Sequence, residues 1–152
     1  GQYDAMMPDA ECIRIIAEIL RKLDIGGFMV KVNHRQILDA MMQECGVSPD
    51  KFRTICSSID KLDKTPWEEV RREMVEEKHL QEDVADRIGN YVKLKSGQNA
   101  IEFADSLLKD ELLSQNKTGV EAIEAMKLLL QYCQLLGVSD VVSFDLSLAR
   151  GL

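Results

Sequence analysis

The chain has 152 residues, 45% of them hydrophobic and 30% charged, and its 19 basic and 26 acidic residues give a formal net charge of −7 at pH 7. This length suits one ordinary domain, which would bury roughly 68–70% of the surface that its unfolded form exposes. The acidic balance argues against a dedicated nucleic-acid coat or a membrane-surface protein, although it leaves room for a local basic patch.

A helix is the first predicted element. It opens at Pro8, with Asp9 and Glu11 in its first turn, and closes at Gly26 and Gly27. Proline suits the first helical position, acids suit the positive end of the helix dipole, and glycine ends helices. Apolar residues at i, i+3, i+4 spacing predict one buried face. They are Cys12, Ile15, Ile16, Ile19, Leu20 and Leu23.

A strand near residues 28–33 and a second helix come next. Every second residue from Phe28 to Val32 is apolar, which predicts the strand. We interpret His34 as a polar turn residue that begins the helix rather than as a catalytic base, and Gly46 predicts the helix end. The predicted buried side of this helix comprises Ile37, Leu38, Met41, Met42 and Cys45.

The long middle of the chain, residues 48–137, carries helical signals throughout. Ser48 and Thr65 each precede a proline, the arrangement of a capping hydroxyl before the first helical position. Thr65 is followed three residues on by Glu68, the spacing of a capping box, and Thr118 repeats this arrangement. Apolar stripes between these signals predict buried helix faces. Their members are Phe52, Ile55, Cys56, Ile59, Val70, Met74, Val84, Ile88, Tyr91, Val92, Ile123, Met126, Leu130 and Cys133.

The last predicted strand covers residues 141–149. From Val142 to Leu148 every second residue is apolar, which is typical of a half-buried strand. Arg150 falls on the apolar parity, where an unpaired charge costs several kcal/mol. Two interpretations stay open: an anion lies beside the guanidinium, or the strand has already ended. A planar guanidinium at a strand end suits bidentate capture of a phosphate or a carboxylate.

Two strands on either side of a long run of helices predict an α+β fold that is predominantly helical. Two strands alone are marginal in water, so we expect further strands of the same sheet to lie outside this chain. The chain would then be a segment of a larger domain, with two pieces of sheet and a helical insertion between them.

Metal sites and common catalytic motifs are not expected. The sequence has no GxxxxGK[ST], GxGxxG, HExxH or GxSxG motif. Its four cysteines lack CxxC spacing and fall on apolar stripes, which favours reduced structural thiols over a zinc site with His34 or His79. The cysteines are Cys12, Cys45, Cys56 and Cys133. Five glutamates at helical spacing favour a solvated face over a metal cluster; they are Glu68, Glu69, Glu73, Glu76 and Glu77.

Charge and hydropathy also bear on partners. A modest basic concentration in the helical middle could touch a phosphate backbone, or it could be scattered surface charge. Its members are Lys51, Arg53, Lys61, Lys64, Arg71 and Arg72. No apolar run approaches the ~20 residues that span a bilayer, and no signal-peptide layout begins the chain, so we expect an intracellular protein with no membrane partner.

Six stretches of the sequence resemble the histidyl-tRNA synthetase family in order and spacing, above all its eukaryotic cytosolic members. They are "FMVKVNHRQILDAMM", "CGVSPDKFRTICSSIDKLDK", "WEEVRREMV", "VADRIGNYV", "LSQNK" and "SFDLSLARGL". Together they extend over most of the chain. The run from Leu148 to Leu152 resembles the beginning of the family's histidine-specific signature, an Arg-Gly-Leu-Asp-Tyr-Tyr run.

The resemblance implies a class II synthetase and a division of the chain. Residues 1–50 and 138–152 would belong to a catalytic domain built on an antiparallel sheet, of which the two predicted strands are part. Residues 51–137 would form a helical insertion domain that approaches the acceptor stem of histidine tRNA. The six basic residues are then candidates for contact with tRNA, and the parent protein is expected to be a cytoplasmic homodimer.

The resemblance also implies a reaction. Family members activate histidine with ATP, accompanied by Mg²⁺, to histidyl-adenylate, release pyrophosphate, and pass histidine to the 3′ end of histidine tRNA. Arg150 matches the family's catalytic arginine, which contacts the α-phosphate of ATP and the histidine carboxylate. The family's other substrate-binding motifs would lie outside this chain, so we expect the chain alone to be inactive and to hold no cofactor.

Two other interpretations stay open. A synthetase-like regulatory domain would bind uncharged tRNA without making adenylate, but such relatives commonly lose catalytic signature residues, and this chain keeps the start of the signature. A helical module that binds protein partners would fit the capped helices and leave the two strands unexplained.

Overall fold

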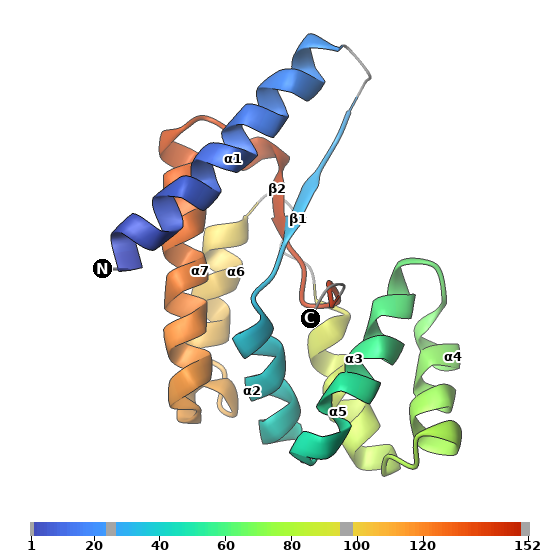
Figure 1. The fold of residues 1–152 in the computed structure, drawn as a ribbon. Helices are drawn as coiled ribbons and strands as arrows, with labels where there is room; N and C mark the ends of the chain where they lie inside the picture. Colours follow the sequence, from blue (N-terminus) through green and yellow to red (C-terminus); the bar gives the residue numbers. More distant parts are fainter. Residues whose placement is uncertain (1, 24–26, 95–98, 150–152) are drawn as a thin grey trace.

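The computed structural model describes residues 2–23, 27–94 and 99–149 (Figure 1). Its helices are α1 (Gln2–Lys22), α2 (Arg35–Cys45), α3 (Phe52–Ile59), α4 (Trp67–Arg72), α5 (Glu82–Val92), α6 (Ala100–Leu108) and α7 (Lys117–Leu135). Its strands are β1 (Val30–Val32) and β2 (Val142–Phe144). Short 3-10 turns cover Pro49–Lys51, Asp60–Asp63, Leu113–Gln115 and Ser139–Val141, and Glu73–Glu77 forms a π-helical turn. The predominantly helical α+β prediction is confirmed.

The two strands lie side by side and run parallel, so the predicted antiparallel arrangement is wrong for this pair. Val30 pairs with Val142 and Val32 with Phe144. Parallel neighbours need a crossover of a dozen or more residues, and the whole helical middle of the chain supplies it. Period-two alternation is the same in both kinds of sheet, so the sequence pattern could not distinguish them.

Strand β2 is shorter and more deeply buried than predicted. It ends at Phe144, where residues 141–149 were expected to be extended, and its polar side chain Ser143 is buried together with its apolar ones. Helix α6 covers the strand, and the rings of Phe103 and Phe144 meet edge to face with centroids 5.3 Å apart. A strand covered on both faces shows no polar side, so the half-buried prediction for it is wrong.

Helix α1 differs from its prediction at both its start and its buried face. It begins at Gln2, and Pro8 lies inside it. Among its residues 8–22, the buried ones are Ala10, Ile13 and Ala17. By contrast, Ile15, Ile16 and Ile19, which were predicted to be buried, are 47%, 48% and 52% exposed. The helix lies across α7 (Figure 1), and small alanines allow that close approach, whereas spacing alone does not choose between two adjacent apolar stripes.

The other helices bury the faces that the sequence predicts. Helix α2 ends at Gly46, whose φ of +101° is the left-handed conformation that glycine adopts freely. The predicted stripes of α3, α5 and α7 are buried, apart from Phe52, which is half-buried. Two predicted caps are wrong by one or two residues: α4 is capped by Pro66, and α7 by Asn116, whose Oδ1 accepts from Gly119 N at 3.0 Å.

The helices form two groups on either side of the strand pair (Figure 1). Helices α3, α4 and α5 make one group, and α1, α6 and α7 make the other; α2 contacts both through α5 and α7. A Cβ on Gly119 would lie 2.7 Å from the Cβ of Ala40, so glycine is needed where α7 crosses α2. No helix in the described part of the chain is long and apolar enough to cross a membrane. The predicted domain boundaries stay a prediction.

Candidate functional site at the end of the strand pair

The chain leaves β2 through a tight turn made by Asp145. This carboxylate is 1% exposed, and its Oδ1 accepts hydrogen bonds from Ser147 N at 2.9 Å and Ser147 Oγ at 2.6 Å. An aspartate that accepts from the backbone two residues on makes an Asx turn. Leu148 N also donates to Asp145 O at 3.2 Å, which closes the turn.

Asn33 holds the same turn from the other strand. It directly follows β1, and its Nδ2 donates to Leu148 O at 3.0 Å and, at 3.5 Å, to Leu146 O. Asp145 N donates to Val32 O at 3.1 Å, the last backbone bond between the strands. The segment after β2 is therefore fixed by a side chain from β1 after the ladder of the sheet has ended.

A charged hollow of about 160 Å³ opens beside this turn. It is lined by Lys31, Asp60, Asp63, Asp145, Ser147 and Leu148. Lys31 Nζ lies 3.8 Å from Asp145 Oδ2, so the buried carboxylate faces a half-exposed cation. The hollow joins the strand ends to the turn that follows α3, and thus borders on the predicted insertion.

Arg150 lies outside the described residues. The chain is described up to Ala149, which is 5% exposed. Because β2 ends at Phe144, the alternation that predicted a buried guanidinium stops well before Arg150. The second interpretation, that the strand has already ended, is therefore confirmed, and the capture of an anion by Arg150 stays a prediction.

Three of the six basic residues predicted to contact tRNA have partners in the fold. Lys61 pairs with Glu73, and Arg71 Nε donates to Asp86 Oδ1 at 2.7 Å. Lys51 Nζ donates to His79 O at 3.4 Å. The other three are exposed and make no ion pair with the described residues; they are Arg53, Lys64 and Arg72.

These pairs change the electrostatics of the α3–α4 region. Lys61 lowers the pKa of Glu73, and Arg71 lowers the pKa of Asp86. A hollow of about 330 Å³ lies between the turn that follows α3 and the segment formed by α4 and the π-helical turn, and four of its eight lining residues are glutamates. It is lined by Lys61, Thr65, Glu69, Val70, Arg72, Glu73, Glu76 and Glu77. An acidic lining repels a phosphate backbone, so contact with tRNA there would depend on Arg72 at the hollow and on Arg53 and Lys64 outside it.

The remaining candidates are structural where the fold describes them. His34 caps α2 through its Nδ1, which accepts from Gln36 N at 3.1 Å, so it is the turn residue predicted. His79 adopts a left-handed φ of 58° in the turn before α5. Burial raises the pKa of Cys45 to about 12, whereas Cys12, predicted to be buried, is exposed. Among the described residues no three His, Cys, Asp or Glu side chains are placed to hold a metal ion.

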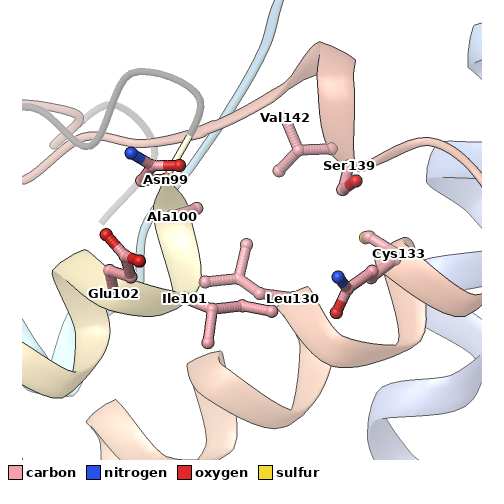
Figure 2. A pocket seen from close by; sticks show the side chains of 9 residues that line it. Asn99, Ala100, Ile101, Glu102, Leu130, Cys133, Ser139 and Val142 are labelled. Atoms are coloured by element: carbon pink, nitrogen blue, oxygen red, sulfur yellow. The ribbon is translucent and has the colours of Figure 1, made fainter.

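A third hollow, of about 310 Å³, lies between α6, α7 and the start of β2 (Figure 2). Its walls are mostly apolar, with Ile101, Leu130 and Val142 among them, and the Cys133 side chain borders it. Burial raises the pKa of Cys133 to about 11, so the thiol is protonated and unreactive at neutral pH. Glu102 and Cys133 are the ionisable side chains among the described residues that line this hollow.

Sequence reasoning missed Asn33, Asp145 and Asn116. Asp145 stands two residues before Ser147, a spacing that suits an Asx turn and could have been recognised. Asn33 gives no local signal, because its partners lie 113 and 115 residues further along the chain. Asn116 bonds both its own helix and the side chains of Gln43 and Glu44.

Comparisons with known proteins agree over the whole chain. A family model described as Histidyl-tRNA synthetase matches residues 2–152. The chain is 58% identical to the cytoplasmic histidine–tRNA ligase of Mesocricetus auratus and 53% identical to the mitochondrial histidine–tRNA ligase of Homo sapiens. Each match covers 100% of this chain and 29% of the relative, so the chain spans less than a third of the length of these relatives.

The fold agrees with the sequence matches. A crystal structure of histidyl-tRNA synthetase from Nostoc sp. PCC 7120 superposes with a TM-score of 0.84 at 25% sequence identity. The superposition covers 97% of this chain and 34% of that one. On the full-length family match, the high sequence identities and the shared fold, the chain belongs to the histidyl-tRNA synthetase family.

Proposed function

We propose that this chain is part of a histidine–tRNA ligase. The parent protein activates histidine with ATP to histidyl-adenylate, releases pyrophosphate, and transfers histidine to histidine tRNA. The observation that carries the proposal is the family match over residues 2–152 together with relatives that are named histidine–tRNA ligases. The Arg150-Gly151-Leu152 run, which resembles the start of the family's histidine signature, supports it.

Arg150 is the catalytic residue that this chain contributes. Attack of the histidine carboxylate on the α-phosphate brings two anions together and builds charge on the phosphoryl oxygens. A fixed guanidinium between them reduces their repulsion in the ground state and stabilises that charge in the transition state. Its planar fork can donate to both groups at once.

The proposal extends to partners and compartment. Mg²⁺ arrives with ATP as part of the substrate, the helical insertion of residues 51–137 approaches the acceptor stem of histidine tRNA, and the parent protein is a homodimer. Within the insertion, the exposed cations Arg53, Lys64 and Arg72 are better placed to meet phosphate than Lys51, Lys61 and Arg71, which have partners. Relatives are named cytoplasmic and mitochondrial, and we propose the cytoplasm for this protein.

The regulatory alternative predicts binding of uncharged tRNA without adenylate formation. The names of the matched relatives favour the enzyme, because both are ligases. A helical partner-binding module is not favoured either, since the fold resembles that of a synthetase over 97% of this chain.

Histidine-dependent exchange of radioactive pyrophosphate into ATP tests the proposed activity in the full-length protein. We expect exchange with histidine and none with glutamine or asparagine, whose side chains also donate and accept hydrogen bonds. Tight binding of uncharged histidine tRNA with no exchange would contradict the ligase and support the regulatory domain.

The 152-residue chain alone gives a second test. It spans 29% of its relatives, so we expect it to show no exchange and no tight binding of ATP by isothermal titration calorimetry. Submicromolar binding of ATP to this chain would contradict the expectation that most of the pocket lies elsewhere.

A further inference from the structure

We infer that Asn33 and Asp145 are positioning residues that aim the segment carrying Arg150, a role that rests on the proposed function. Neither residue is assigned to substrate contact. The structure places both at the end of the strand pair, where they fix residues 146–148 by side-chain hydrogen bonds beyond the last backbone bond between the strands, from Asp145 N to Val32 O.

Asn33 contributes the connection between the two strands. Its Nδ2 lies 3.0 Å from Leu148 O and 3.5 Å from Leu146 O, so one amide group serves two carbonyls on the same short segment. Those carbonyls follow β2, which ends at Phe144. Backbone pairing therefore does not hold them, and Asn33 replaces it.

Asp145 contributes the bend within the segment. Its buried Oδ1 accepts from both the backbone and the hydroxyl of Ser147, at 2.9 and 2.6 Å. Leu146 is fully buried and Ala149 is 5% exposed, so apolar packing anchors the segment between these polar contacts. Arg150 follows Ala149 directly, hence the direction in which the chain leaves this turn determines where its guanidinium can reach.

The orientation of the Asn33 amide suggests a use beyond stability. Its Oδ1 is buried and accepts no hydrogen bond from the described residues. A buried acceptor without a partner costs stability. Turning the amide over would place that oxygen against two carbonyl oxygens, so the side chain keeps its donor on the segment at the expense of its acceptor. Electrostatic stabilisation of a transition state depends on donors that are held in place before the reaction. Fixing the segment that precedes Arg150 would hold its guanidinium in this way.

Three variants of the full-length protein test the inference. Asn33→Leu removes both donated bonds at similar volume, and Asp145→Ala removes the turn. Because small misplacements of a catalytic group can cost ~10²-fold, we expect each to lower kcat of histidine-dependent exchange by about 10-fold to 100-fold, with smaller changes in KM for ATP and histidine. Asp145→Asn keeps an oxygen that can accept from Ser147, so we expect this variant to retain most of the wild-type rate.

Asn116→Ala is the matched control. Asn116 is a buried asparagine that accepts from the backbone of Gly119 and donates to the side chains of Gln43 and Glu44, at the start of α7. Asn33, by contrast, is half-buried and donates to two carbonyls. Asn116→Ala should lower the melting temperature about as much as Asn33→Leu does while leaving kcat within about twofold of wild type. Equal losses of kcat in Asn33→Leu and Asn116→Ala would reduce Asn33 to a general stabilising role and overturn the inference.

A double-mutant cycle with Arg150→Ala separates the inference from the proposed function. If Asn33 acts through Arg150, Asn33→Leu should cause no further loss in the Arg150→Ala background, whereas a merely structural defect would lower the rate again. A repeated loss there, or a normal rate in Asn33→Leu and Asp145→Ala, overturns the positioning role alone. Unchanged exchange in Arg150→Ala itself would overturn the role of Arg150 in the proposed function. Should Asn33→Leu fail to fold, the Asp145→Ala and Asp145→Asn pair decides in the same cycle.

Discussion

His34 begins α2 with an imidazole where a hydroxyl or carboxylate is more usual. Its Nδ1 must be unprotonated to accept the hydrogen bond from Gln36 N. Burial lowers the pKa of His34, so the folded chain favours the neutral ring that the cap needs. The cap is therefore sensitive to pH in a way that a serine or asparagine cap is not.

Stability should reflect this sensitivity. On acidification through about pH 6.5 the unfolded chain takes up a proton at His34 before the folded chain does, so the free energy of unfolding falls as pH falls. Above that pH the ring is neutral in both states and contributes no dependence. Urea unfolding of this chain at about pH 7.5 and about pH 5.5 should show a larger loss for wild type than for His34→Asn, which keeps a cap that does not titrate. Equal losses in the two proteins would show that His34 contributes nothing to the pH dependence.

At the scale of elements, α1 shows where periodicity is ambiguous. Two apolar stripes run along this helix, one of isoleucines and one that includes the alanines, and both satisfy i, i+3, i+4 spacing. Packing across α7 selects the stripe with the small residues. Helices α2, α3, α5 and α7 have one stripe each, and there the sequence predicted the buried face.

A pair of isoleucines on α1 tests the corrected face. Ile13 is 8% exposed and Ile16 is 48% exposed. Ile13→Ala should lower the free energy of unfolding by about 2–4 kcal/mol because it leaves a cavity, while Ile16→Ala should cost less than about 1 kcal/mol. Urea unfolding of both variants measures the difference. A larger loss for Ile16→Ala would mean that the originally predicted face is the buried one.

The predictions of strand direction and of the α7 cap were wrong for a related reason. Alternation indicates extended backbone but carries no information on strand direction, which depends on the long crossover between β1 and β2. The cap of α7 was displaced to Asn116 because that residue also bonds Gln43 and Glu44 on α2, a tertiary gain that the local sequence does not show.

At the scale of the whole molecule, some residues of the candidate site can be recognised from sequence motifs, and others only from contacts between distant parts of the chain. Arg150 was singled out because the apolar alternation was predicted to run up to it, although β2 ends at Phe144, and because the residues around it resemble the family's signature. Asn33 could not be found in that way, because a side-chain bond to a carbonyl more than a hundred residues away leaves no periodic signal. The counter-ions of Lys61 and Arg71 were hidden for the same reason.

Three parts of the chain form the candidate site. Asn33 comes from the end of β1, Asp145 from the end of β2, and Asp60 and Asp63 line the adjoining hollow from the helical middle. The parallel pairing of β1 and β2 is what brings the carboxyl ends of both strands to the same edge. A correct sheet direction is therefore a condition for the proposed positioning of Arg150.

The most direct test of the central claim is the rate of histidine-dependent ATP–pyrophosphate exchange in the full-length protein with Arg150→Ala. Loss of one preorganised donor costs ~3–4 kcal/mol, so the rate should fall by ~10²–10³-fold while the melting temperature stays close to that of wild type. Exchange at the wild-type rate in a folded Arg150→Ala protein would contradict the assignment of this residue to catalysis.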